Sequence, residues 1–61
     1  MLSYNDEEAV RSFVYNIIDG LPPGKLIGNK KMEFLSEIIR DSKSVSEAKA
    51  LTLERIKKYK T

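Results

Sequence analysis

The residue types that most often carry out covalent catalysis are scarce in this chain. Its 61 residues include no cysteine and no histidine, so the commonest pairs of nucleophile and base cannot form. The serines fall mostly at expected helix caps and turns, where a hydroxyl bonds to nearby backbone groups. We therefore predict that the protein is not an enzyme and uses no cofactor.

A row of carboxylates is the nearest approach to a metal site. Glu33, Glu37 and Asp41 recur every four residues and would share one face of a helix. Helical metal centres need Glu-x-x-His pairs or several inward-facing acids from different helices. This single row lies away from the apolar residues, flanked by Lys30 and Arg40. We interpret it as a solvated face and predict no metal ligands.

Basic residues accumulate toward the C-terminus of a chain whose net charge is only +2. Residues 1–20 carry four acidic side chains and one arginine, whereas residues 45–61 carry five basic side chains and two acidic ones. Nucleic acids attract such positive segments through their phosphates. If the chain binds nucleic acid, seven residues are the predicted contacts: Lys30, Lys31, Lys49, Arg55, Lys57, Lys58 and Lys60.

A helix-turn-helix formed by residues 30–41 and 45–58 is the arrangement considered for such binding, with the second helix as the reader. The turn between them lacks the glycine often found there, and Glu47 would face phosphates early in the reading helix. DNA-binding domains also usually show a larger basic excess. Binding of DNA or RNA is therefore the alternative function, not the first choice.

Two features of the preceding loop support this alternative. Over a few turn residues, the stretch 18–24 is similar to the hairpin between two helices that grips a DNA backbone. The N-terminus of the next helix would offer free N–H groups beside Lys30 and Lys31, and such a place attracts anions. A nucleotide-binding P-loop is not predicted, because the required glycine spacing and the preceding strand are missing.

Four residues are candidates for a protein interface. Tyr15 lies off the apolar stripe of its helix, beside Arg11, and both residue types are enriched where proteins meet. Phe34 lies at the edge of one apolar face, and Leu53 belongs to another broad one. Faces this wide are more than one short bundle can hide. We predict a protein–protein interaction or regulatory module that uses these residues as its interface and that also self-associates.

The elements that must position these residues are organised around one helix. Apolar side chains between residues 9 and 18 follow the i, i+3, i+4, i+7, i+8 spacing of a helix with one buried face. At about 100° per residue they cover roughly half of its circumference. A helix that rests on one partner needs a narrower stripe, so we predict that this helix packs against two neighbours.

The first helix is expected to begin and end at recognisable residues. Asn5 followed by Glu8 resembles a capping box, with Ser3 and Asp6 as a competing pair two residues earlier. Gly20 should end the helix in the left-handed conformation of a Schellman motif.

The next segment should form a corner before the second helix. Residues 22–24 read Pro-Pro-Gly, which forbids helix. Leu26 and Ile27 are apolar in an otherwise loop-like stretch, so we expect both to fold back over the end of the core. Asn29 is the expected N-cap of the second helix.

One long helix from residue 30 onward is not expected. Its apolar face would stop at Ser42, whereas Ser44 and Glu47 form a second capping box that opens a new apolar pattern. The sequence therefore predicts an all-α fold, a small three-helix bundle in a single domain of residues 1–61. Its helices are predicted over about residues 6–19, 30–41 and 45–58.

The short length bears on the state of association. A chain of about 60 residues buries only about 60% of the surface that its unfolded form exposes. The alternative fold therefore keeps the same helices but opens them, so that two chains complete one bundle. Acids at residues 6–8 argue against a leader peptide, and no apolar run reaches 18 residues. We expect a cytoplasmic homo-oligomer that binds another protein and no membrane.

Overall fold

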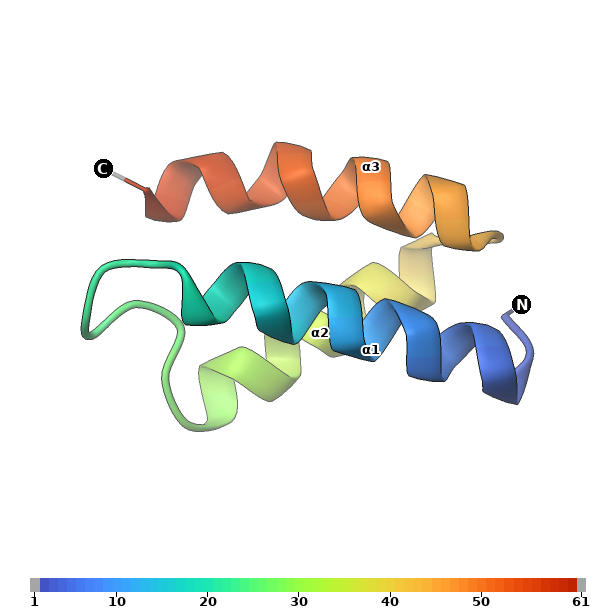
Figure 1. Ribbon diagram of the computed structural model, residues 1–61, viewed down its shortest axis with the longest axis horizontal. Coiled ribbons are helices and arrows are strands. Elements are labelled where there is room, and N and C mark those ends of the chain that lie inside the picture. The colour runs from blue at the N-terminus through green and yellow to red at the C-terminus, as the bar shows by residue number, and fades with distance from the viewer. Residues whose placement is uncertain (1, 61) are drawn as a thin grey trace.

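The computed structural model describes residues 2–60, which form three helices that pack on one another (Figure 1). They are α1 (Tyr4–Asp19), α2 (Asn29–Asp41) and α3 (Val45–Arg55), and the 3-10 helix η1 (Ile56–Tyr59) continues α3. α1 and α3 run side by side in the same direction, and α2 returns behind them at an angle. Within the described residues there is no strand, and the predicted three-helix bundle is confirmed. No helix in this range is long and apolar enough to cross a bilayer.

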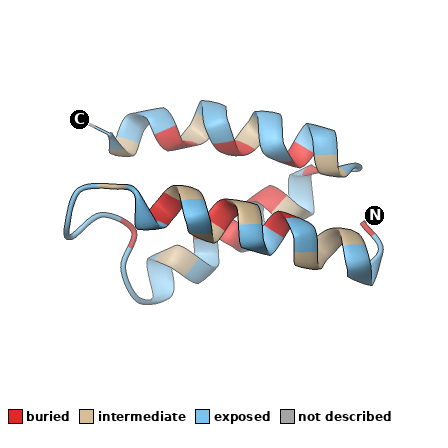
Figure 2. Cartoon of the chain, viewed as in Figure 1, coloured by how far each residue is buried: buried red, intermediate tan, exposed pale blue. Residues whose placement is uncertain are grey.

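α1 packs against both other helices, as its wide apolar stripe predicts. Val10, Val14 and Ile18 are buried one turn apart, and Phe13 and Ile17 are half-buried beside them. The buried positions face inward on every helix (Figure 2). Each fully buried side chain of this kind contributes about 1.5–3 kcal/mol relative to an exposed one.

Two hydroxyl side chains lie inside this core with their hydrogen bonds satisfied. Thr52 is fully buried and donates from Oγ1 to the Ala48 carbonyl over 2.7 Å. Ser42 donates from Oγ to the Ile38 carbonyl where α2 ends. Among the described residues no buried side-chain nitrogen or oxygen lacks a partner, so the polar atoms do not weaken the core.

α1 begins earlier than the first choice of cap implies. The Ser3 hydroxyl accepts a hydrogen bond of 3.2 Å from the Asp6 N–H, and Asn5 lies inside the helix. The capping role predicted for Asn5 is therefore wrong, and the competing pair is the real cap. The physical reason is Leu2, which is only 5% exposed and reaches the core from this earlier start.

The end of α1 also differs from the prediction. Gly20 does end the helix, but at φ −87°, in the right-handed region, so the Schellman motif is wrong. The Gly20 and Leu21 N–H groups bond to carbonyls three residues back, which tightens the last turn. Positive φ appears instead at Gly24, Leu26 and Gly28.

Leu26 and Gly28 explain how the loop enters α2. Leu26 has a φ of 49°, a region that costs a non-glycine residue about 1–2 kcal/mol, and its burial offsets that cost. Gly28, not Asn29, precedes the helix, and no side chain caps it. The prediction for Asn29 is therefore wrong. The expected burial of Ile27 is wrong too, since this side chain is 64% exposed.

The break between α2 and α3 is confirmed. Ser42 is extended, which ends α2. The Ser44 hydroxyl accepts from the Glu47 N–H over 3.2 Å, as the capping box predicts. The Glu47 carboxylate accepts in return from the Lys43 N–H over 3.1 Å, one residue before the cap. The third helix ends as η1, so only its last turn departs from a regular α-helix.

Candidate functional site

One end of the molecule carries most of its positive charge. We call it the basic end and define it as residues 19–31 and 56–60, which are the last residue of α1, the loop, the start of α2, and η1 (Figure 1). Its charged residues are six lysines and Asp19, a net of +5: Lys25, Lys30, Lys31, Lys57, Lys58 and Lys60.

The rest of the chain is neutral or acidic. The opposite end, residues 2–8 and 40–47, holds five acidic and two basic side chains, a net of −3. The remaining residues, 9–18, 32–39 and 48–55, form the middle of the molecule. They hold three acidic and three basic side chains and are neutral. The charge is therefore separated along the longest dimension of the molecule, which measures 31 Å.

Core packing brings the separate parts of the basic end together. Ile56 is fully buried and fixes the start of η1. The Tyr59 ring meets the Phe34 ring of α2 edge-on, with 6.0 Å between centroids and 84° between planes. A hollow of about 310 Å³ is lined by Leu26 of the loop, by Lys30 and by these two rings, and its α2 side also carries Glu33 and Glu37. The loop, α2 and η1 thus form one surface.

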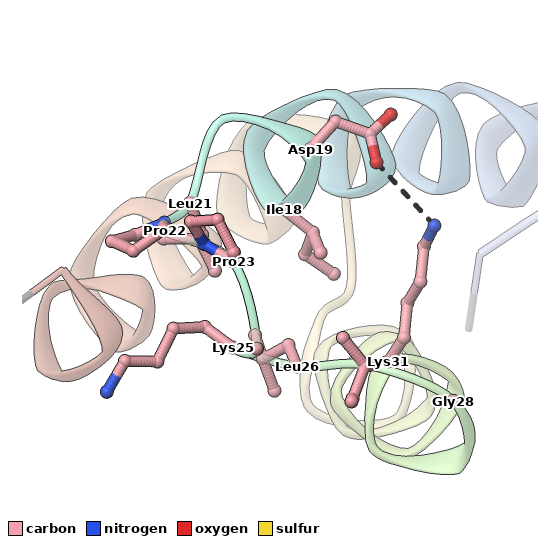
Figure 3. A pocket seen from close by; sticks show the side chains of 11 residues that line it. Ile18, Asp19, Leu21, Pro22, Pro23, Lys25, Leu26, Gly28 and Lys31 are labelled. Carbon is pink, nitrogen blue, oxygen red and sulfur yellow. Dashed lines mark ion pairs between the residues drawn. The ribbon is translucent and has the colours of Figure 1, made fainter.

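A second hollow, of about 290 Å³, lies between the end of α1, the loop and the start of α2 (Figure 3). On one side Lys31 Nζ lies 3.7 Å from Asp19 Oδ1 and 4.5 Å from the centre of the Tyr15 ring. Lys25 points away from that pair. Lys31 therefore ties α2 to α1, whereas Lys25 extends from the loop.

Most of these lysines have no ionic partner within the described part of the chain. Only Lys31 of the six pairs with a carboxylate there, and Lys58 Nζ lies 5.3 Å from the Tyr59 ring centre. The three arginines, by contrast, are all paired away from the basic end, with Glu8 or Asp41 at 2.9–3.0 Å. Five ammonium groups are thus left to attract an anionic ligand.

The backbone at the start of α2 contributes less than the sequence suggests. The N–H groups of Lys30 and Lys31 bond to the Ile27 and Gly28 carbonyls at 3.3 and 3.1 Å. Two of the N–H groups at this helix start are therefore already engaged, so fewer are free beside these lysines than the sequence suggests. Any anion at this surface would meet lysine ammonium groups first.

The nucleic-acid contacts predicted from the sequence divide into two groups. Lys30, Lys31 and the three lysines of residues 57–60 come together at the basic end. Lys49 does not, because its Nζ lies 5.4 Å from the Phe13 ring centre in the middle of the molecule. Arg55 pairs with Asp41. The start of α3, which a reading helix would present to bases, lies at the opposite end.

Lys25 is a site residue that the sequence reasoning missed. It lies in the loop beside Gly24, shortly before the helix that carries Lys30 and Lys31. That position was the available signal, but only the folded loop shows that Lys25 and η1 share one end.

The residues predicted for a protein interface are spread over the molecule. Arg11 is exposed and pairs with Glu8 at 3.0 Å, and Tyr15 is half-buried beneath Lys31. Phe34 is 4% exposed, so it belongs to the core and offers a partner almost no surface. Leu53 is 47% exposed on α3. The structure does not gather these four residues into one exposed surface.

Other exposed apolar side chains have local explanations. Ile27 and Met32 stand just before the cap of α2 and at its fourth position, the places of a hydrophobic staple. Tyr4 lies in the first turn of α1, at the opposite end. These side chains come from separate segments, as Leu53 does.

The carboxylate row behaves as a solvated face. Asp41 binds Arg40 and Arg55, and these hydrogen bonds, from Arg40 first, hold the pKa of Asp41 below its ordinary value. Within the described residues no three metal-ligating side chains form a cluster.

Comparisons of the chain with protein-family models, with curated proteins and with solved structures gave no match. What the basic end can do must therefore be inferred from its own charges and shape. Lysine is a compact charge with three donors, suited to phosphate and carboxylate oxygens.

Proposed function

We propose that the protein is a small non-enzymatic binding module whose basic end contacts the phosphates of a nucleic acid. The observation that carries this proposal is the contrast in pairing, in which every arginine has an acidic partner and five lysines of the basic end have none among the described residues. A phosphate backbone binds unpaired cations by releasing its own condensed counterions. The net charge of +5 at one end makes this contact directional.

The proposed contact surface differs from a helix-turn-helix. α2 and α3 do form a helical pair joined by a short turn, but the lysines gather at the C-terminal end of the third helix. The residues exposed early in α3 are Ser46 and Glu47, and the acid would repel phosphates. We therefore assign the contact to the basic end and not to a reading helix.

The test compares two double variants that remove the same charge from different places. Lys57→Gln/Lys58→Gln alters the basic end, and Lys43→Gln/Lys49→Gln, elsewhere on the surface, is the matched control. Binding to a labelled 20-base-pair duplex is measured by fluorescence anisotropy over a series of salt concentrations. With five phosphate contacts, log affinity should fall with log salt with a slope of about −4 to −5.

The basic-end variant should make that slope less steep by about 2 and should weaken binding at low salt about tenfold or more. The control should retain both the slope and most of the affinity. Absence of binding at 100 μM protein in low salt, or equal losses in the two variants, would contradict the proposal. Circular dichroism of both variants checks that the fold is unchanged.

Protein binding and self-association stay predictions with one supporting observation. Leu53 and Ala50 are exposed on the outer face of α3, where a polar helix surface would be usual. A second chain could cover this face. Light scattering over a wide concentration range checks it, and the mass of a single chain at every concentration would exclude it. A cytoplasmic location, suggested by the absence of cysteine, belongs to the same set of proposals.

A further inference from the structure

We infer that the nucleic acid bound at the basic end is a duplex. The end face of the protein contacts phosphates of both strands, and it binds without preference for base sequence. This inference rests on the function proposed above and names the form of nucleic acid that the same surface fits. It follows from three observations: the spread of the lysines, the engagement of the nearby aromatic rings, and the absence of arginine from the basic end.

The lysines of the basic end do not come from one continuous segment. They come from three segments, which are the loop, the start of α2, and η1 with Lys60. The two shorter dimensions of the molecule are 20 and 15 Å. The major groove of a B-form duplex is about 12 Å wide and has a backbone on each side. Figure 3 shows Lys25 and Lys31 extending to opposite sides of the hollow, so lysines of this end can meet phosphates on the two sides of such a groove.

The aromatic rings near the basic end are partly covered by neighbouring side chains. Binding of single strands usually combines a positive groove with exposed rings on which the bases stack. Lys31 covers the Tyr15 ring at 4.5 Å, and Tyr59 lies edge-on against the buried Phe34 ring. Tyr4, which is 74% exposed, lies at the opposite end. Tyr15 and Tyr59 are half-buried, and neither is exposed as Tyr4 is, so among the described residues the basic end offers unpaired bases only a partly covered stacking surface.

The basic end also lacks the side chains that read bases. Bidentate contacts to base edges come chiefly from arginine, asparagine and glutamine. Residues 19–31 and 56–60 contain no arginine or glutamine and one asparagine, Asn29. The arginines of the chain are held in ion pairs elsewhere. Lysine ammonium groups at this face would thus contact phosphates and leave the base sequence unread.

The experiment measures the affinity of the full chain for four labelled ligands of 16 nucleotides per strand. Two are DNA duplexes of unrelated sequence, one is an RNA duplex, and one is a single DNA strand without self-complementarity. The two DNA duplexes should bind within about fivefold of each other, less than a single good base contact usually gives. The single strand should bind at least fivefold more weakly, with a shallower salt slope. The DNA duplexes should bind more tightly than the RNA duplex, because the major groove of an A-form helix is narrower than that of B-form DNA.

A pair of variants sharpens this test. Lys31→Ala removes one charge and uncovers the Tyr15 ring, whereas Lys30→Ala removes one charge and uncovers no ring. Lys30→Ala should weaken the duplex and the single strand alike. Lys31→Ala should narrow the difference between them by about threefold or more, because a stacked base adds affinity for the single strand only.

The possible failures are distinguishable. If no ligand binds, the proposed function itself is wrong. If the single strand binds as tightly as the duplexes, or if one DNA sequence is preferred more than tenfold, the duplex inference is wrong and phosphate binding stands. Equal behaviour of Lys30→Ala and Lys31→Ala would show that covering the Tyr15 ring is irrelevant to the choice of ligand.

Discussion

The two ends of the molecule differ in whether their polar side chains have partners within the described part of the chain. At the end where α1 and α3 begin, Ser3 and Ser44 cap the helices and Glu47 closes the turn between α2 and α3. Ser42 bonds back into α2, and Asp41 holds two arginines. At the basic end, α2 begins without a side-chain cap, and within the described residues only Lys31 finds a carboxylate.

This difference shows where the chain is stabilised and where it is available for binding. A helix cap contributes about 1 kcal/mol, and an exposed ion pair contributes less than that on average. Lysines close to one another repel each other and make no such contribution to stability. The polar groups of the opposite end therefore add stability, while those of the basic end keep charges that only a ligand can neutralise.

The largest expected effect comes from the core beneath the basic end. Ile56 is fully buried, and Ile56→Ala should lower the free energy of unfolding by about 2–5 kcal/mol through lost burial and the cavity left behind. Urea or thermal unfolding followed by circular dichroism measures it, with the exposed neighbour as control, Lys57→Ala. If the two variants are equally stable, η1 is not packed as described and the basic end is not a fixed surface.

A smaller effect is expected at the opposite end. Ser44→Ala removes the cap of α3 and should cost about 1 kcal/mol of stability, while affinity for a duplex stays the same. Ser46→Ala, two residues on and exposed, is the matched control and should change neither. A loss of duplex affinity in Ser44→Ala would contradict the separation of the two ends.

The smallest effect is expected in how the stability of the fold depends on pH in the acid range. Because the folded pKa of Asp41 is lowered by Arg40 and then by Arg55, its stabilising contribution is fully present above the ordinary carboxyl pKa of about 4. That contribution is lost as the pH falls through the lower, folded pKa. Asp41→Asn should therefore be less stable than the natural chain at neutral pH, and the difference should shrink on acidification. Unfolding midpoints across the acid range measure this, with Glu33→Gln as control; a difference that does not change with pH would contradict it.

Short-range features explain which structural predictions are confirmed. The stripe of α1 and the capping box of Ser44 and Glu47 involve residues within two turns of each other, so the local sequence determines them. Three local predictions are wrong, for Asn5, Gly20 and Asn29. At the start of α1 the sequence offers two caps, and the chain uses the earlier one, from which Leu2 is buried in the core.

The site could be predicted only in part for the same reason. Five of the predicted nucleic-acid contacts share the basic end. The sequence could predict them because the positive residues near the expected helix C-terminus and near the loop are clustered along the chain. Lys49 and Arg55 do not share it, since Phe13 and Asp41, far away in sequence, hold them elsewhere. Lys25 was missed because nothing in a linear charge count connects it with η1.

The sequence by itself determined three helices, the break near Ser42, and the absence of cysteine and histidine, since periodicity, caps and residue types are local properties. Tertiary structure alone decided that Lys25, Lys30 and η1 share one surface. Burial of Leu26 and Ile56 and the edge contact between Phe34 and Tyr59 hold those segments together. Hydrophobic burial depends on apolar area and not on the charges of neighbouring surface residues. The position of the lysines could therefore be seen only in the folded structure.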